Sequence, residues 1–122
     1  MRSEALATLK ADSLHAGALH FLAMWHAEVM RVDPVSRALA RAFLGADVFK
    51  LASWDEAQRL LEKAVAVDPQ RLVHRLDLAA VYADRGNRAK ARETYEFITR
   101  APAREFNDDV YQRVAAERLR KL

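Results

Sequence analysis

Residues 53–102 read SWDEAQRLLEKAVAVDPQRLVHRLDLAAVYADRGNRAKARETYEFITRAP, and this stretch decides the fold. Asp68-Pro69 and Gly86-Asn87 interrupt a pattern of apolar residues that recur three and four positions apart. Asp and Asn are preferred N-cap residues, Pro fits the first helical turn, and Gly takes the left-handed conformation in which helices often end. We therefore predict consecutive helices over residues 54–67, 70–85 and 88–100.

The small residues of this stretch stand where two antiparallel helices would touch. Ala57, Ala79 and Ala91 occupy these positions, whereas Tyr82 and Tyr95 are large residues suited to fill the gap between neighbouring hairpins. Helical repeats of about 34 residues combine small and large residues in this way. The pattern predicts a right-handed stack of antiparallel helical hairpins.

The first hairpin needs a partner helix for 54–67, and two segments could supply it. One is 38–52. The other is 14–31, which ends in a second Asp-Pro signal at Asp33-Pro34 and begins with the repeat-like sequence AGALHFL. We favour 14–31, which makes the helix near 34–45 an insertion and leaves residues 46–52 as either a loop or a continuing turn.

Local signals add detail to these helices. Asp12 or Ser13 is expected to cap helix 14–31, and Ser53 to cap 54–67 in a capping box whose Glu56 reaches back to the Ser53 N–H. An ion pair between Asp55 and Arg59 and a hydrophobic staple between Phe106 and Tyr111 are expected as well. Further helices are predicted over 3–11 and 108–121, giving six to seven in all.

Composition agrees with an all-α fold. The 122 residues are 52% hydrophobic and include only three Gly, three Pro and no Cys, so neither a disulfide framework nor a thiolate metal site can form. We expect residues 1–122 to form one domain, either complete or part of a longer repeat protein. The favoured location is the cytoplasm, with the periplasm open if a signal has been removed; no segment reads as a membrane span.

The stretches 54–69 and 72–102 resemble the tetratricopeptide repeat (TPR), and the likeness extends over most of the chain from about residue 12. The order of helices also resembles the TPR-like domain of the regulator of microtubule dynamics family. The matching sequences are HAGALH (15–20), WHAEV (25–29), RAFLG (41–45) and SWDEA (53–57). This resemblance implies a helical interaction domain in a family with some members tied to membranes, microtubules or lipid handling.

Residues that could carry chemistry are few and scattered. His20 and His26 are six positions apart and point to different sides of a helix, so they cannot share a metal ion as histidines four apart can. The serines stand at expected caps, and the three glycines are isolated rather than grouped in a phosphate-binding loop. We expect neither catalysis, a metal nor a cofactor.

A hairpin stack has a concave face lined by its first helices, and this face is the candidate site for a protein or peptide partner. The predicted groove is apolar and acidic, which suits an amphipathic or basic segment. Its lining residues are His20, Met24, Glu28, Val73, Leu76, Asp77, Ala80, Asp84, Asp109 and Gln112.

Other interpretations stay open. A cavity between helices 14–31 and 34–45 would indicate a carrier of lipid or another apolar ligand, whereas a groove filled by the last helix would indicate a structural repeat. Self-association through Leu6, Leu9 or Leu119 would give a homodimer. The basic end of the last helix complements its macrodipole and lacks interleaved aromatic residues, so we do not expect nucleic acid as a partner.

Overall fold

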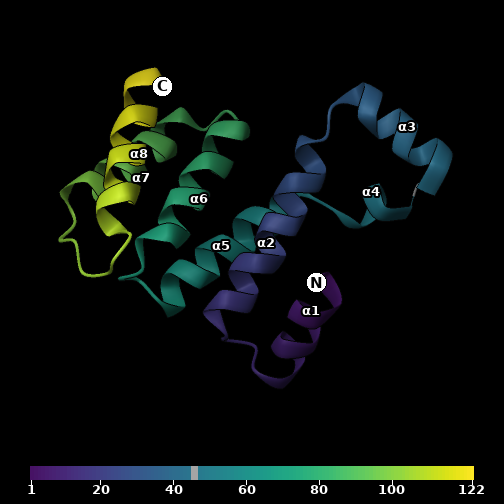
Figure 1. Ribbon diagram of the computed structural model, residues 1–122, viewed down its shortest axis with the longest axis horizontal. Coiled ribbons are helices and arrows are strands. Elements are labelled where there is room, and N and C mark those ends of the chain that lie inside the picture. Colours follow the sequence, from purple (N-terminus) through teal and green to yellow (C-terminus); the bar gives the residue numbers. More distant parts are fainter. Residues whose placement is uncertain (45–46) are drawn as a thin grey trace.

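The computed structural model describes residues 1–44 and 47–122, and every regular element within these ranges is an α-helix. The helices (Figure 1) are α1 (Arg2–Ala11), α2 (Ala16–Arg31), α3 (Pro34–Leu44), α4 (Asp47–Leu51), α5 (Trp54–Val67), α6 (Leu72–Asp84), α7 (Arg88–Arg100) and α8 (Asp108–Lys121). The all-α prediction is confirmed, and α4 is an addition to it. Within the described ranges, no helix has both the length and the apolar character needed to cross a membrane.

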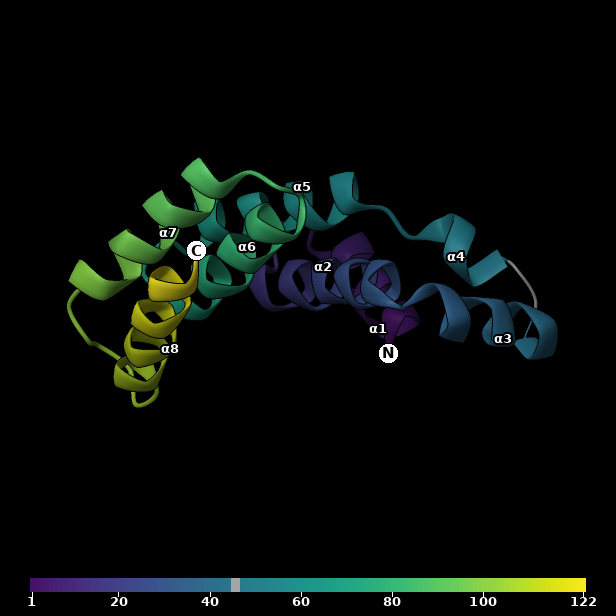
Figure 2. The same cartoon turned by 90° about the horizontal axis from the view of Figure 1, so that it is seen from above.

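The helices form two layers, as the view in Figure 2 shows. One layer contains α5 and α7, and the other contains α2, α6 and α8. Helix α2 packs against α5 and α6 against α7, so each pair is an antiparallel hairpin; α5 and α6 join the two hairpins, and α8 extends the stack beyond α7. The predicted TPR-like stack is confirmed, and α2 is the first arm of the first hairpin.

Small residues allow the paired helices to approach closely. Ala23 and Ala27 on α2 and Ala57 and Ala64 on α5 have no exposed surface, and these two helices pack against each other. The larger core residues fill the spaces around these contacts: Leu61, Tyr82, Tyr95 and Ile98 are each at most 6% exposed. Because an alanine contact leaves no room for a longer side chain, this spacing fixes which helix faces which.

Two of the predicted breaks have the expected geometry. Gly86 has φ of 81°, a conformation that favours glycine, and the Asn87 side chain accepts a hydrogen bond from Lys90 N at 3.2 Å. Ser53 Oγ likewise accepts from Glu56 N at 3.0 Å. The second half of the capping box is wrong, because the Ser53 N–H donates to His26 Nδ1 at 3.2 Å while Glu56 binds Arg59 instead.

Other local expectations are corrected by longer-range contacts. Asp55 pairs with Arg85 of the next hairpin rather than with Arg59, at 2.5 Å between Oδ1 and Nη2. His15, not Asp12 or Ser13, caps α2 by accepting from Ala18 N at 3.0 Å. Phe106 is 96% exposed, so it does not form the predicted staple with Tyr111.

The loop between α7 and α8 is organised by one buried carboxylate. Asp108 is 1% exposed, and its Oδ2 accepts hydrogen bonds from the backbone N–H groups of Arg104 and Glu105 at 2.8 and 2.9 Å. These bonds satisfy two donors that no helix could serve. The shape of this loop therefore depends on the side chain of Asp108.

Helices α3 and α4 form an arm that projects from the end of α2, away from the stack (Figures 1 and 2). The insertion predicted near 34–45 is confirmed as α3, whose predicted end at Gly45 lies outside the described residues. Asp33 starts α3 by accepting from Ser36 N at 2.8 Å. Since α3 extends beyond α2 rather than along it, the two helices do not enclose the cavity that a ligand carrier would need.

Candidate functional site

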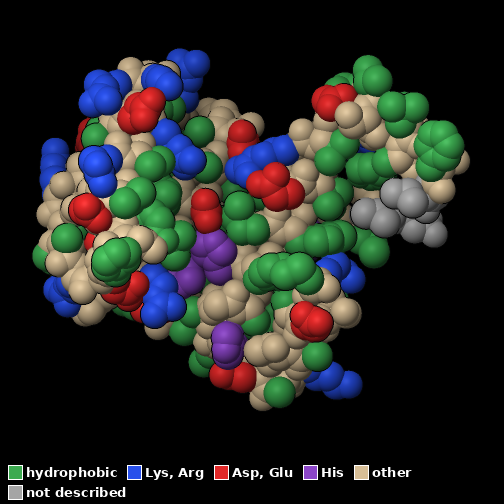
Figure 3. Space-filling model, in the orientation of Figure 1, with side chains coloured by type: hydrophobic (Ala, Val, Ile, Leu, Met, Phe, Trp, Pro, Cys, Tyr) green, Lys and Arg blue, Asp and Glu red, His purple; other side chains and the backbone are tan. Residues whose placement is uncertain are grey.

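The residues of the predicted groove come from α2, α6 and α8, and α6 is set back between the other two (Figure 2). Most are at least partly exposed on this face: His20, Met24, Glu28, Val73, Asp77, Ala80, Asp84, Asp109 and Gln112. Leu76 differs, because it is 7% exposed and belongs to the core. In the space-filling view, imidazole and carboxylate groups lie side by side in the middle of this face (Figure 3).

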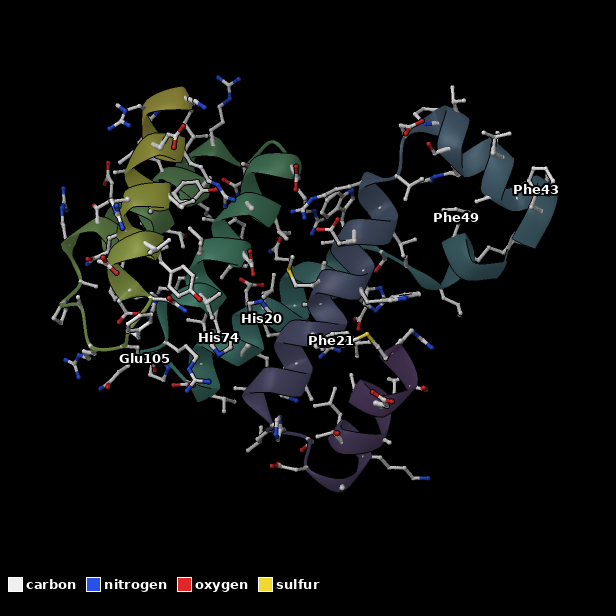
Figure 4. All side chains as sticks on the ribbon, in the orientation of Figure 1. His20, Phe21, Phe43, Phe49, His74 and Glu105 are labelled. Atoms are coloured by element: carbon white, nitrogen blue, oxygen red, sulfur yellow. The ribbon has the colours of Figure 1, made fainter. Side chains whose placement is uncertain are left out.

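Two histidines and an aspartate join α2 to α6 at the centre of the face. His20 Nδ1 lies 2.7 Å from His74 Nδ1, and His20 Nε2 lies 2.7 Å from Asp77 Oδ2. The rings of His20 and His74 face each other between the two helices in Figure 4, with centroids 4.9 Å apart. The structure therefore brings together two predicted groove residues, His20 and Asp77, and a third residue, His74, that was not among the predicted site residues.

The geometry restricts where protons can sit. A short contact between the two Nδ1 atoms requires one to donate and the other to accept, so only one of them carries a hydrogen. His20 Nε2 must carry another to donate to the Asp77 carboxylate. The fourth nitrogen, His74 Nε2, is buried without a hydrogen-bond partner and lies 3.8 Å from Asp68 Oδ2.

Burial of His74 lowers the pKa of its imidazole, and a charge on His20 lowers it further. Asp68 and Asp77 act in the opposite direction but do not reverse the effect. The pair therefore resists carrying a positive charge on both rings, which is also what the shared Nδ1 contact requires. Burial thus favours the neutral form of His74 within the protein core.

A second set of polar contacts joins α2 to α6 further along the same face. Arg31 donates from Nε to Asp84 Oδ2 and from Nη1 to Glu28 Oε1, each at 2.8 Å. Burial lowers the pKa of Arg31, but the hydrogen bonds and charges of the two acids outweigh this and raise it overall. Its guanidinium also lies 5.7 Å from the centre of the Trp54 ring.

On α8, the predicted residues serve the helix itself and its neighbour. Gln112 Nε2 donates to the carbonyl oxygens of Ala101 and Ile98 at the end of α7, at 2.5 and 3.3 Å. Asp109 pairs with Arg113 one turn later, at 3.4 Å between Oδ2 and Nη2. These side chains position α8 as one wall of the face.

The face is therefore less acidic than the sequence analysis predicted. Asp77 and Asp84 were expected to be available to a basic partner, but His20 and Arg31 already contact them. Arg31 was missed, although it follows Glu28 at the i,i+3 spacing of helical ion pairs. The partly exposed side chains of Met24, Val73 and Ala80 remain without such a role.

Within the described ranges, no group of three or more His, Cys, Asp or Glu side chains is arranged to hold a metal ion.

An open cleft of about 680 Å³ lies away from this face, where α5, α6 and α7 meet, and its lining includes Val65, Leu78 and Phe97. Arg75 borders this cleft, with its guanidinium 4.0 Å from the centre of the Phe97 ring.

Comparison with known proteins gives one match. The model of a protein family described as "Regulator of microtubule dynamics protein 1-3" matches residues 1–122. No curated protein and no solved structure matches the chain.

Proposed function

The chain belongs to the regulator of microtubule dynamics family, and we propose that it is a protein-interaction module whose partner binds across α2, α6 and α8. The partner segment would be an extended or helical peptide, since a groove between helices can bind either one. This proposal assigns the binding to the predicted groove and no chemistry to the chain.

The observation that supports it most directly is the position of α6. This helix lies between α2 and α8 in Figure 2, and its partly exposed residues Val73 and Ala80 share a helix face with Asp77, which contacts His20 of α2. Helix α8 packs against α6 and α7 and, among the described residues, makes no packing contact with α2. This supports a place for the last helix beside the proposed groove rather than within it.

The side chains of this face suit a partner with an apolar stripe. Met24, Val73 and Ala80 offer small or flexible apolar contacts, and methionine adapts to irregular surfaces. Beside these residues, Arg31 Nη2 and Asp84 Oδ2 form an ion pair at 2.6 Å, which supplies polar contacts at the edge of the proposed groove. A partner helix with apolar residues at i, i+4 and i+7 would match this arrangement.

Replacing Ala80 by Arg tests the proposal, because a long charged side chain would fill the groove. Ala66→Arg is the matched control, since Ala66 is exposed on α5 in the opposite layer. We expect Ala66→Arg to bind the same partners as the unchanged protein. Ala80→Arg should bind those partners with an affinity at least about tenfold lower. Circular dichroism would establish that both variants are folded, and equal recovery by both would disprove binding at this face.

A further inference from the structure

The centre of the face holds a carboxylate and two histidines, and the net charge of these three groups depends on the number of protons that the histidines hold. Asp77 and His20 are partly exposed, with side-chain exposures of 24% and 15%, whereas His74 is buried beneath them. A partner lying in the groove would therefore meet Asp77 and His20 directly. This inference rests on the proposed function, since it concerns regulation of the same site.

The charged groups around the histidine pair come from two elements besides α2. Asp77 lies on α6, and Asp68 and Arg71 lie in the turn between α5 and α6, where Arg71 pairs with Asp68 at 3.5 Å. Glu105, before α8, approaches only as far as Arg71, at 3.4 Å. Asp77 is therefore the acid that contacts the pair. Asp68, Arg71 and Glu105 lie further out and carry charges of both signs.

Two proton counts fit the observed contacts. With two protons, both rings are neutral: His20 donates from Nε2 to Asp77, His74 donates from Nδ1 to His20, and the group of three carries the single negative charge of Asp77. His74 Nε2 then presents a lone pair toward Asp68 and is unsatisfied.

With three protons, the same contacts persist and the charge changes. His74 Nε2 gains a hydrogen directed toward Asp68, one hydrogen stays between the Nδ1 atoms, and His20 still donates to Asp77. Each ring nitrogen then takes part in one of these contacts, and His20, His74 and Asp77 together carry no net charge. A fourth proton would place two hydrogens between nitrogens 2.7 Å apart and break the link.

We infer that the third proton of the His20–His74 pair and a cationic side chain of the partner compete for Asp77. When the pair holds two protons, Asp77 offers a partner Lys or Arg one uncompensated negative charge. When the pair holds three, that charge is cancelled from within the protein. The partner class is therefore a segment with a Lys or Arg at its centre, bound more tightly at higher pH.

Thermodynamic linkage makes the effect reciprocal. If the third proton weakens the partner, then the bound partner must expel that proton by the same factor. Proton release on binding would accordingly be largest in the pH range where the pair titrates. A partner with an acidic or neutral central residue would show neither effect.

The proton count can be measured without a partner. Nitrogen NMR of the imidazoles through a pH titration would give the tautomer and charge of each ring. We expect His20 and His74 to take up one shared proton, with His74 Nε2 protonated in that state and the second cation absent until the fold is lost. Two rings that charge independently of each other would overturn the inference.

The competition is measured with a defined probe, a 14-residue amphipathic helix of Leu and Lys, against a control helix of Leu and Glu. Affinities by calorimetry at about pH 8 and about pH 5.5 bracket the ordinary titration of imidazole. We expect the Lys helix to bind several-fold more weakly at the lower pH, and the Glu helix to show no such loss. Circular dichroism at both values confirms that the protein stays folded.

Variants separate this inference from the proposed function. The double variant His20→Gln/His74→Gln keeps a donor for Asp77 but removes both rings that can carry the charge, so the Lys helix should bind equally at both pH values. Asp77→Asn should lower its affinity at high pH to the low-pH level. Binding that Ala80→Arg removes but pH does not change refutes the competition alone; a Lys helix that binds at neither pH, or that ignores Ala80→Arg, refutes the competition and the proposed face together.

Discussion

The hairpin stack and the α3–α4 arm use the same residues to opposite effect. Both are rich in Ala, Leu and Arg, yet Ala23, Ala57 and Ala91 of the stack have no exposed surface, while Val35, Leu39 and Phe43 of α3 are 69, 55 and 82% exposed. These three residues are spaced by four and form one stripe along the outer side of the arm (Figure 3). An amphipathic pattern therefore specifies a helix but not what covers it.

The reason for the difference is what each helix faces. In the stack, the buried alanines lie between packed helices, whereas Arg37 of α3 donates to the Met30 carbonyl oxygen of α2 at 3.4 Å and the same side of α3 faces α4. There the guanidinium groups of Arg37 and Arg41 lie 5.2 and 5.8 Å from the centre of the Phe49 ring, between the two helices in Figure 4. The arm thus holds its arginines inward by cation–π contacts and leaves its apolar stripe outward.

The largest expected effect comes from making one substitution in both regions. Leu61 has no exposed surface, so Leu61→Ala should lower the free energy of unfolding by about 2–5 kcal/mol. Leu39→Ala, on the arm, should change it by less than about 0.5 kcal/mol. Urea unfolding followed by circular dichroism gives both values. Similar losses for the two variants would show that the arm is packed as tightly as the stack.

Enlarging an alanine should have a somewhat smaller effect. Ala91 is buried where α7 meets α6, and Ala91→Leu should overpack this contact and destabilise the protein by about 1–3 kcal/mol. Ala42→Leu adds the same atoms to an exposed position of α3 and should be nearly neutral. Thermal unfolding of the two variants is the measurement, and an unchanged midpoint for Ala91→Leu would contradict the hairpin packing.

The smallest expected effect is the change in the free energy of unfolding with pH, and it should arise from the hairpin stack and not from the arm. Burial is the main cause that lowers the pKa of both His26 and His74, so the unfolded chain binds more protons than the folded one as pH falls. Their contribution to stability is complete above the ordinary pKa of 6.5 and is lost as pH falls through the lower folded values.

Residues 34–51 contain no histidine, so this acid loss belongs to the stack. Unfolding free energies measured at a series of pH values should decline below about pH 6.5. His26→Gln should flatten part of that decline, because glutamine can still accept a hydrogen bond without taking up a proton. An identical pH profile for the variant would remove His26 from the explanation.

Sequence reasoning succeeded where the deciding information is local. Caps such as Asn87 and the small residues Ala57 and Ala91 lie within one or two turns of what they specify, so the hairpins could be predicted. The contact between His20 and His74 joins residues 54 positions apart and depends on how α2 and α6 are aligned in the stack. No spacing rule within one helix contains that alignment.

Local rules failed where a distant group offered a better partner. The Ser53 N–H was assigned to Glu56, three residues away, but α2 brings His26 within 3.2 Å of it. Asp55 was assigned to Arg59, but the neighbouring hairpin supplies Arg85. In each case the fold itself created a competing donor or acceptor, which sequence spacing alone could not reveal.

The two hairpins also differ in how their helices are joined, which bears on the order of folding. A short turn around Gly86 connects α6 to α7, whereas the chain between α2 and α5 passes through the whole arm. Closing a longer loop costs more entropy, although each doubling of length adds only about 0.6 kcal/mol. The α6–α7 pair should therefore nucleate first, and α2 should dock onto α5 afterwards, with the arm as a connection whose length can vary at little thermodynamic expense.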